Sequence, residues 1–149
     1  MQVKTVMSKK GYDVFSISPD DTVLKVLQLF SNKKIGFVIV GNLPDDIMGT
    51  VSERDICHAL SHSPGISRAD KIKKVMTKNI LYCDMEDSLT KVMAIMTGCR
   101  SRHVLVREQN NFIGIISIGD VVKYRLDESL HEEQDLLQYI HGTGYNYAG

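Results

Sequence analysis

The two halves of this 149-residue chain repeat one pattern, and this repeat constrains the fold more than any other feature. The most specific match pairs residues 49–55, Gly-Thr-Val-Ser-Glu-Arg-Asp, with residues 114–120, Gly-Ile-Ile-Ser-Ile-Gly-Asp. Upstream of each motif, apolar residues recur with the i, i+3, i+4, i+7 spacing of a helix that buries one face. These residues are Val23, Val26, Leu27 and Phe30 in the first half and Leu89, Val92, Met93 and Met96 in the second. The chain is therefore expected to fold as two similar units.

Each half is expected to fold as strand, helix, strand, strand and helix. After each amphipathic helix, two apolar runs flank a short polar turn, which predicts a β-hairpin. The hairpin strands are expected at residues 37–40 and 47–51, and at residues 104–106 and 112–116. The closing helices are expected at residues 53–62 and 118–140. Neither half can bury its apolar faces alone, so the sequence predicts a mixed α/β (α+β) fold in which two pseudo-symmetric repeats pack as one module.

The repeat divides the chain into four segments. They are a first repeat, a connection containing Pro64-Gly65, a second repeat, and an acidic C-terminal helix and tail: residues 1–62, 63–71, 72–126 and 127–149. The last segment has five acidic side chains and no Lys or Arg. Its apolar residues predict an amphipathic helix that ends at Gly142: Leu130, Leu136, Leu137 and Ile140. Packing against the module or a second subunit is the favoured interpretation, and docking to another protein is the alternative.

The repeated motif places Ser and Asp at a strand-to-helix junction in both halves. A helix N-terminus offers unpaired backbone N–H groups and the positive end of the helix dipole, which together favour a bound phosphate. The Ser hydroxyl can donate to this phosphate, and the Asp carboxylate one turn into the helix can accept from ribose hydroxyls. Ser-x-x-Asp is also close to a capping box, which needs no ligand. The two explanations are compatible, and the presence of two copies favours nucleotide binding.

With these motifs the chain resembles the CBS-domain pair, a family named after cystathionine beta-synthase, over residues 3–125. More narrowly, it is similar to bacterial stand-alone CBS-pair proteins in four short stretches: Ile35-Gly36, residues 52–55, Arg102-His103 and residues 117–123. The resemblance implies a pseudo-twofold module with two clefts, which bind AMP, ADP, ATP, NAD or S-adenosylmethionine in various members. AMP is the nucleotide expected here, with ATP or NAD as alternatives, and no metal is expected.

Carried over by position, the resemblance implies that each cleft combines residues of both repeats. One cleft would be formed by Val14, Ile35, Gly36, Ser117, Gly119 and Asp120. The other would be formed by Ser52, Arg54, Asp55, Thr77, Ile80, Ser101, Arg102 and His103. Phe37 stands where these relatives have a small residue, so we expect it to narrow one adenine pocket. Lys10 can also reach a phosphate, although a surface lysine is the favoured interpretation.

Other chemistries lack a recognisable pattern in this sequence. His58 and His62 lie four residues apart with Cys57 beside them, but no third ligand has convincing spacing for a metal. The number and spacing of the three cysteines, Cys57, Cys83 and Cys99, match neither a disulfide framework nor a zinc site. All three are expected to be reduced, structural thiols. The sequence contains no recognisable nucleophile with its base, carboxylate pair or glycine-rich phosphate loop. We therefore expect a protein that binds a ligand without catalysis.

Charge and hydropathy narrow the expected partners. The net charge is zero and the isoelectric point is about 7.0, unlike the basic character of a nucleic-acid-binding domain. Residues 66–125 nevertheless carry 11 basic and 6 acidic side chains, so this segment is a candidate to face an anion. No apolar run is long enough for a membrane helix and no signal peptide is recognisable, so a cytoplasmic protein without membrane contact is expected. We expect a homodimeric nucleotide sensor that acts on an unknown protein target; the alternative is a dimerisation module with empty clefts.

Overall fold

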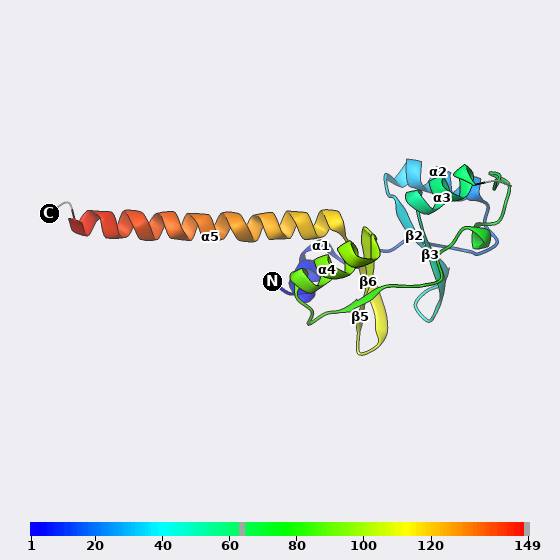
Figure 1. Cartoon of the computed structure of the whole chain (residues 1–149). Coiled ribbons are helices and arrows are strands. Elements are labelled where there is room, and N and C mark those ends of the chain that lie inside the picture. The colour runs from blue at the N-terminus through cyan, green and yellow to red at the C-terminus, as the bar shows by residue number, and fades with distance from the viewer. Residues whose placement is uncertain (63–64, 148–149) are drawn as a thin grey trace.

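Two small β-sheets, each with its own helices, form the body of the molecule (Figure 1). The computed structural model describes residues 1–62 and 65–147, so residues 63–64 of the expected connection and 148–149 of the expected tail lie outside it. The first repeat contains β1 (Ser16–Ile17), α2 (Val23–Lys33), β2 (Phe37–Asn42), β3 (Asp46–Ser52) and α3 (Glu53–Ser61). The second contains β4 (Tyr82–Asp84), α4 (Leu89–Cys99), β5 (His103–Glu108), β6 (Asn111–Ser117) and α5 (Ile118–Tyr147). The mixed α/β fold of two similar repeats is therefore confirmed.

The two sheets share one topology and one register. β1 pairs in parallel with β2, and β2 pairs antiparallel with β3; β4, β5 and β6 repeat this arrangement. Phe37 lies opposite Ser52 at the open end of the first hairpin, and His103 lies opposite Ser117 in the second. The register therefore brings the Ser of each motif beside the first residue of the preceding strand.

Each repeat is completed by a segment from the other side of the molecule. α1 (Val3–Lys10) precedes β1 in the sequence, yet its apolar residues are buried in the core of the second repeat: Val3, Val6 and Met7. The short helix η1 (Ile72–Lys74) precedes β4, and Ile72, Val75 and Met76 pack in the core of the first repeat. This exchange of crossing segments joins the two repeats into one module.

The glycine of each motif is explained by these crossing segments. A Cβ atom added at Gly49 would lie 2.8 Å from the backbone oxygen of Thr77, and one added at Gly114 would lie 2.5 Å from Met7 Cε. At the first of these places, Thr50 and Thr77 exchange backbone hydrogen bonds of 2.9 and 2.8 Å. Position 49 therefore needs glycine because the backbone of another segment approaches the sheet too closely for any side chain, whereas at position 114 the end of the flexible Met7 side chain would have to move.

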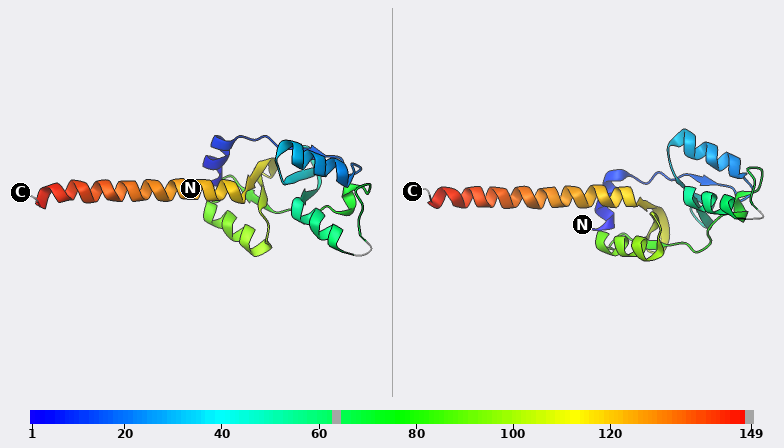
Figure 2. Two further views of the ribbon diagram at one scale, coloured as in Figure 1. Left: turned by 90° about the horizontal axis from the view of Figure 1, so that it is seen from above. Right: turned by 45° about the horizontal axis from the view of Figure 1, so that its top comes forward.

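α5 extends beyond the body of the molecule as a single helix (Figures 1 and 2). Val121 and Tyr124 in its first turns are buried in the second core, and Glu128 accepts a 3.1 Å hydrogen bond from the amino group of Met1. Residues 129–142 are all exposed, so the interpretation that this segment packs against its own module is wrong.

The predicted end of this helix is also wrong, since α5 continues through Gly142 to Tyr147. Gly142 does not adopt the left-handed conformation that ends many helices. A glycine inside a helix costs only about 1 kcal/mol, which is too little to stop it. Across residues 1–62 and 65–147, no helix combines the length and apolar character that crossing a membrane requires.

Candidate functional site

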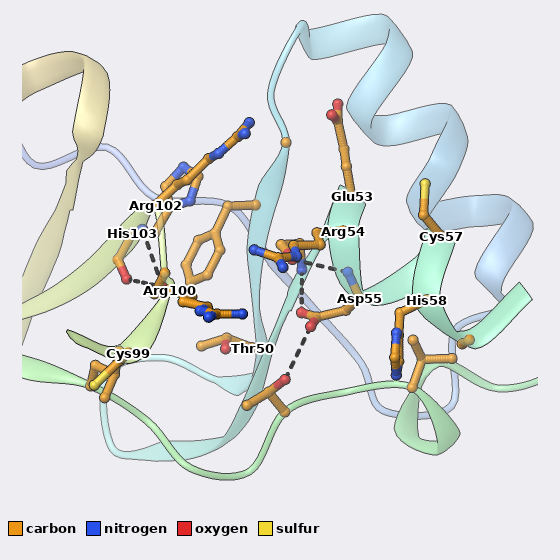
Figure 3. Close-up of a pocket in the computed structure, with 18 of the residues that line it drawn as sticks. Thr50, Glu53, Arg54, Asp55, Cys57, His58, Cys99, Arg100, Arg102 and His103 are labelled. Carbon is orange, nitrogen blue, oxygen red and sulfur yellow. Dashed lines mark hydrogen bonds between the residues drawn. The ribbon is translucent and has the colours of Figure 1, made fainter. Parts of the chain in front are cut away.

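A cleft of about 1180 Å³ opens between the two repeats beside the first motif (Figure 3). Its walls come from the ends of α2 and α4, the starts of β2 and α3, and the crossing segment around Thr77. Both repeats therefore contribute to one site.

The first motif places Asp55 in the wall of this cleft. Ser52 caps α3: its Oγ accepts a 3.1 Å hydrogen bond from the Asp55 amide, while the Ser52 amide donates to Asp55 Oδ2 at 2.8 Å. Thr77 Oγ1 donates to the other carboxylate oxygen, Asp55 Oδ1, at 3.3 Å. The capping-box explanation is therefore confirmed for this motif. The cap uses one carboxylate oxygen and leaves the second for a partner from the opposite wall.

Positive side chains from both repeats converge on this cleft. Arg54 extends from the first turn of α3 and Arg100 from the end of α4, and Figure 3 shows their side chains reaching toward each other. Arg102, directly before β5, also lines the cleft. Among the described residues, the arginines that form ion pairs are Arg107 and Arg125, so these three guanidinium groups have no carboxylate partner. Unpaired guanidinium groups that face one space are suited to an anion, because they bind phosphate oxygens in a bidentate manner.

Three of the cations in the cleft were not predicted from the sequence: Lys74, which pairs with Asp70 at 3.0 Å, Lys34 and Arg100. Lys34 and Arg100 occupy equivalent positions at the ends of α2 and α4, and both are left-handed, with φ of 54° and 51°. Their backbone N–H groups close the helices by donating to the carbonyls of Phe30 and Met96. The only available signal was their position directly before Ile35 and Ser101, at the end of each predicted helix.

Phe37 and His103 meet where the two repeats join. They occupy equivalent strand positions, and their rings stack with centroids 4.3 Å apart and planes inclined by 11°. Burial, followed by the positive charge of Lys10, lowers the pKa of His103 to about 4. The imidazole is therefore neutral near neutral pH and packs as an aromatic ring. Both rings line the cleft.

The structure brings together most, but not all, of the predicted site residues. Nine of them line the cleft: Ile35, Gly36, Ser52, Arg54, Asp55, Thr77, Ser101, Arg102 and His103. Five do not line it: Val14, Ile80, Ser117, Gly119 and Asp120. Asn79 and Leu81 line it in place of Ile80. Ile35 and Gly36, assigned by resemblance to the cleft of Asp120, therefore lie with Asp55.

The second motif forms the same cap, but its carboxylate has a different neighbour. The Ser117 amide donates to Asp120 Oδ2 at 2.8 Å, and the Asp120 amide donates to Ser117 Oγ at 3.1 Å. Lys10 Nζ lies 2.6 Å from the same Asp120 oxygen. Burial raises the pKa of Asp120, but hydrogen bonds from Lys10 and the Ser117 amide outweigh this and hold the pKa below its usual value. Asp120 is therefore ion-paired within the module.

The structure does not arrange the candidate metal ligands, His58, His62 and Cys57, as a metal centre requires. His62 Nδ1 contacts the carbonyl oxygen of His58 at 2.8 Å, and the two rings lie 4.3 Å apart. In the part of the chain that the structure describes, no three His, Cys, Asp or Glu side chains are grouped as a metal ion requires. Cys57 and Cys99 are exposed, whereas Cys83 is buried, which raises the pKa of its thiol to about 12.

Comparison with known proteins places this geometry in a family. The CBS domain model matches residues 3–62 and 72–127. The CBS-domain containing protein ATU1752 from Agrobacterium tumefaciens is 38% identical, with a TM-score of 0.78 that covers 83% of this chain and 92% of that chain. A protein with CBS domains from Burkholderia ambifaria MC40-6 is 32% identical, with a TM-score of 0.79 over 85% and 95% of the two chains. The CBS domain protein PAE2072 from Pyrobaculum aerophilum, complexed with AMP, shares the fold at 20% identity, with a TM-score of 0.68 over 80% and 89%.

Proposed function

Because the chain belongs to the CBS-domain family, we propose that it is a regulatory module that binds an adenine nucleotide in the cleft between its repeats. The observation that carries this proposal is the convergence of Arg54 and Arg100 on a cleft that Arg102 also lines and that contains Asp55. Arg54 belongs to the first repeat and Arg100 to the second, so one phosphate group between them would contact both repeats. Asp55 supplies an acceptor for ribose hydroxyls.

The cleft suggests one orientation for the nucleotide. The phosphate lies between Arg54 and Arg100, and the ribose hydroxyls donate to Asp55 Oδ1, where they compete with the 3.3 Å hydrogen bond from Thr77. The adenine ring is left with the apolar part of the lining, which includes Leu81 and Leu105. AMP is the proposed ligand, with ATP or NAD as alternatives, and the AMP bound to the Pyrobaculum aerophilum protein of the same fold supports this choice.

Binding in this cleft would change the relation between the repeats. Without a ligand, the converging guanidinium groups of Arg54 and Arg100 repel each other, and an anion between them removes this repulsion. The nucleotide would therefore bind more tightly when the two repeats hold Arg54 and Arg100 close together than when they hold them apart. A ligand shifts an equilibrium between two arrangements only if its affinities for them differ. A protein partner that contacts both repeats would respond to this shift.

We propose binding without turnover and without a metal, in a cytoplasmic protein that contacts neither membrane nor nucleic acid. Two thiols line the cleft, Cys57 and Cys99. Within the described residues, no hydrogen bond joins either of them to a histidine or a carboxylate that could serve as its base. Steady hydrolysis of ATP by the purified protein that is lost in Asp55→Ala would contradict this part of the proposal.

We also propose that the module is a homodimer. Leu126, Leu130 and Leu137 are exposed along α5, with exposed fractions of 56%, 47% and 47%. Burying such side chains against a second copy would stabilise the pair by about 25 cal/mol for each Å² of apolar surface removed from water. Light scattering should give the mass of two chains, and a single-chain mass across micromolar concentrations would contradict the proposal.

The nucleotide proposal is tested first by mass spectrometry of small molecules released from the purified, denatured protein. Calorimetric titration with AMP, ATP and NAD should then show binding to the wild type. Asp55→Ala removes an acceptor whose bonds contribute about 1.5–3 kcal/mol, so affinity should fall about ten- to a hundredfold. Arg100→Ala should weaken phosphate-bearing ligands but leave adenosine unaffected.

The matched control is Arg68→Ala, which removes an exposed arginine that does not line the cleft. This variant should bind like the wild type. If the wild type binds a nucleotide and neither Asp55→Ala nor Arg100→Ala changes its affinity, the site lies elsewhere. If none of the three nucleotides binds, the proposal of AMP, ATP or NAD as the ligand fails, and the alternative of a dimerisation module with empty clefts is favoured.

A further inference from the structure

The two motif carboxylates occupy corresponding places but meet different residues. Aligning Val6-Met7 with Val75-Met76 places Lys10, at the end of one crossing segment, opposite Asn79 in the other. The structure supports this alignment, because Met76 lies against Gly49 in the way that Met7 lies against Gly114. The chain therefore contains two versions of the same junction, one at Asp55 and one at Asp120.

At the first junction the carboxylate has only neutral partners. Asp55 accepts hydrogen bonds from the Ser52 amide and from the Thr77 hydroxyl, and in the described residues it forms no ion pair. Asn79 lies in the lining of the same cleft. A ribose hydroxyl that approaches Asp55 Oδ1 therefore has to replace one neutral hydrogen bond of 3.3 Å.

At the second junction Lys10 occupies the corresponding place. Its Nζ lies 2.6 Å from Asp120 Oδ2 and 2.6 Å from the carbonyl oxygen of Ile115. The two paired side chains are only 26% and 21% exposed. Asp120 Oδ2 also accepts from the amide and the hydroxyl of Ser117, at 2.8 and 2.9 Å. The ammonium group thus neutralises the carboxylate, on the same oxygen that the Ser117 cap uses.

We propose that Lys10 closes the second cleft, so that the module binds one nucleotide, at Asp55. This inference rests on the proposed function of the Asp55 cleft. The motifs themselves are alike in both repeats, and both form the same cap. A ribose hydroxyl that approaches Asp120 would meet a carboxylate already neutralised by Lys10, whose Nζ is held at this junction by the Ile115 carbonyl oxygen as well. The number of bound nucleotides is therefore determined by one residue in each crossing segment, Lys10 or Asn79.

Exchanging these two residues tests the proposal. AMP, ATP and NAD are titrated separately into each variant by calorimetry, and the number bound is counted by native mass spectrometry. The wild type should bind one nucleotide per chain, Lys10→Asn should bind two, and Asn79→Lys should bind none. The double variant Lys10→Asn with Asn79→Lys should bind one, and its affinity should depend on Asp120 instead of Asp55.

Two further variants keep the result interpretable. Lys10→Ala opens the second cleft without adding an amide and should also bind two nucleotides. Lys9→Asn removes the neighbouring lysine, which lies over the Tyr124 ring, and should bind one like the wild type. Thermal unfolding of each variant shows whether it is folded when it is titrated.

The possible results separate this inference from the proposed function. Two nucleotides on the wild type, or one on both Lys10→Asn and Lys10→Ala, would overturn the closure by Lys10 and leave the Asp55 site intact. A tenfold or greater loss of affinity in both Lys10 variants would also overturn it, because Lys10 would then bind the phosphate. No binding to the wild type or to any Lys10 variant would overturn both proposals.

Discussion

Lowering the pH from about 7.5 to about 5 should destabilise this module through His103. The ring is half-buried and stacks on Phe37 at the junction between the repeats. Burial is the main cause that lowers its pKa from 6.5 to about 4, and the charges of Lys10 and Arg102 act in the same direction. Asp120 opposes them, but it is already paired with Lys10.

The direction and size of the effect follow from the two pKa values. In the unfolded chain His103 takes up a proton below about pH 6.5, whereas in the folded chain it stays neutral until about pH 4. The unfolded state therefore gains protons first, and the stability that is fully present above pH 6.5 is lost as the pH falls toward 4. At about pH 5 the full shift corresponds to a loss of about 2 kcal/mol in the free energy of unfolding. Partial exposure of the ring reduces this to between about 1 and 2 kcal/mol.

Urea unfolding followed by circular dichroism at the two pH values measures this loss. His103→Phe keeps an aromatic ring against Phe37 but cannot titrate, so it should lose about 1–2 kcal/mol less than the wild type between the two values. The matched control is His131→Gln, which removes an exposed histidine on α5 and should behave like the wild type. Carboxylates also titrate at low pH, but they are common to all three proteins and cancel in the comparison.

Equal losses in the wild type and His103→Phe would refute the reasoning, because the proton would then be taken up elsewhere. A second variant, His103→Gln, guards against a steric effect of the larger ring. A smaller loss in His131→Gln than in the wild type would likewise move the pH dependence from the junction to the C-terminal helix.

Two further predictions concern packing and thiol chemistry. Gly49→Ala should lower the free energy of unfolding by about 1–3 kcal/mol, since the added Cβ would lie 2.8 Å from the Thr77 oxygen. Gly98→Ala, in an open position of α4, should raise it by about 0.5–1 kcal/mol, and thermal unfolding of both variants checks the contrast. A thiol reagent should modify two cysteines of the folded protein, Cys57 and Cys99, and Cys83 only after unfolding, because its thiol is buried and its pKa is about 12. Rapid modification of Cys83 in the folded protein would contradict the packing described for the second core.

The repeat allowed the fold to be predicted well from the sequence. Apolar residues with helical spacing, and β-rich runs around a polar turn, are local patterns that do not depend on the rest of the chain. The predicted helix at residues 53–62 corresponds to α3, and the first hairpin strands correspond to β2 and β3. The helix end at Gly142 was wrong because glycine ends a helix only when the chain turns left-handed there. No local pattern distinguishes that case from a glycine inside a helix.

The cleft was harder to predict, because it depends on contacts between segments distant in the sequence. Asp55 and Arg54 could be selected from the motif alone, and the structure places both in the cleft. Lys34 and Arg100 could not, since a cation at the left-handed end of a helix looks like an ordinary surface residue. Ile80 was selected instead of its neighbours Asn79 and Leu81 because the packing of the whole segment sets which of its side chains face the cleft.

Lys10 shows why two copies of a motif do not imply two equal sites. The sequence alone predicts an ordinary surface lysine at position 10. Its ion-pair partner, Asp120, lies 110 residues away. Lys10 and Asp120 meet because α1 packs into the core of the second repeat. The repeated sequence pattern does not predict into which core α1 packs. Within each repeat the motif determines the cap and the position of the carboxylate. We propose that the segment crossing from the other repeat determines whether that carboxylate is free for a ligand. Two repeats that share the Gly, Ser and Asp of the motif and form the same cap would then differ because a single residue in each crossing segment, Asn79 or Lys10, leaves one site open and the other closed.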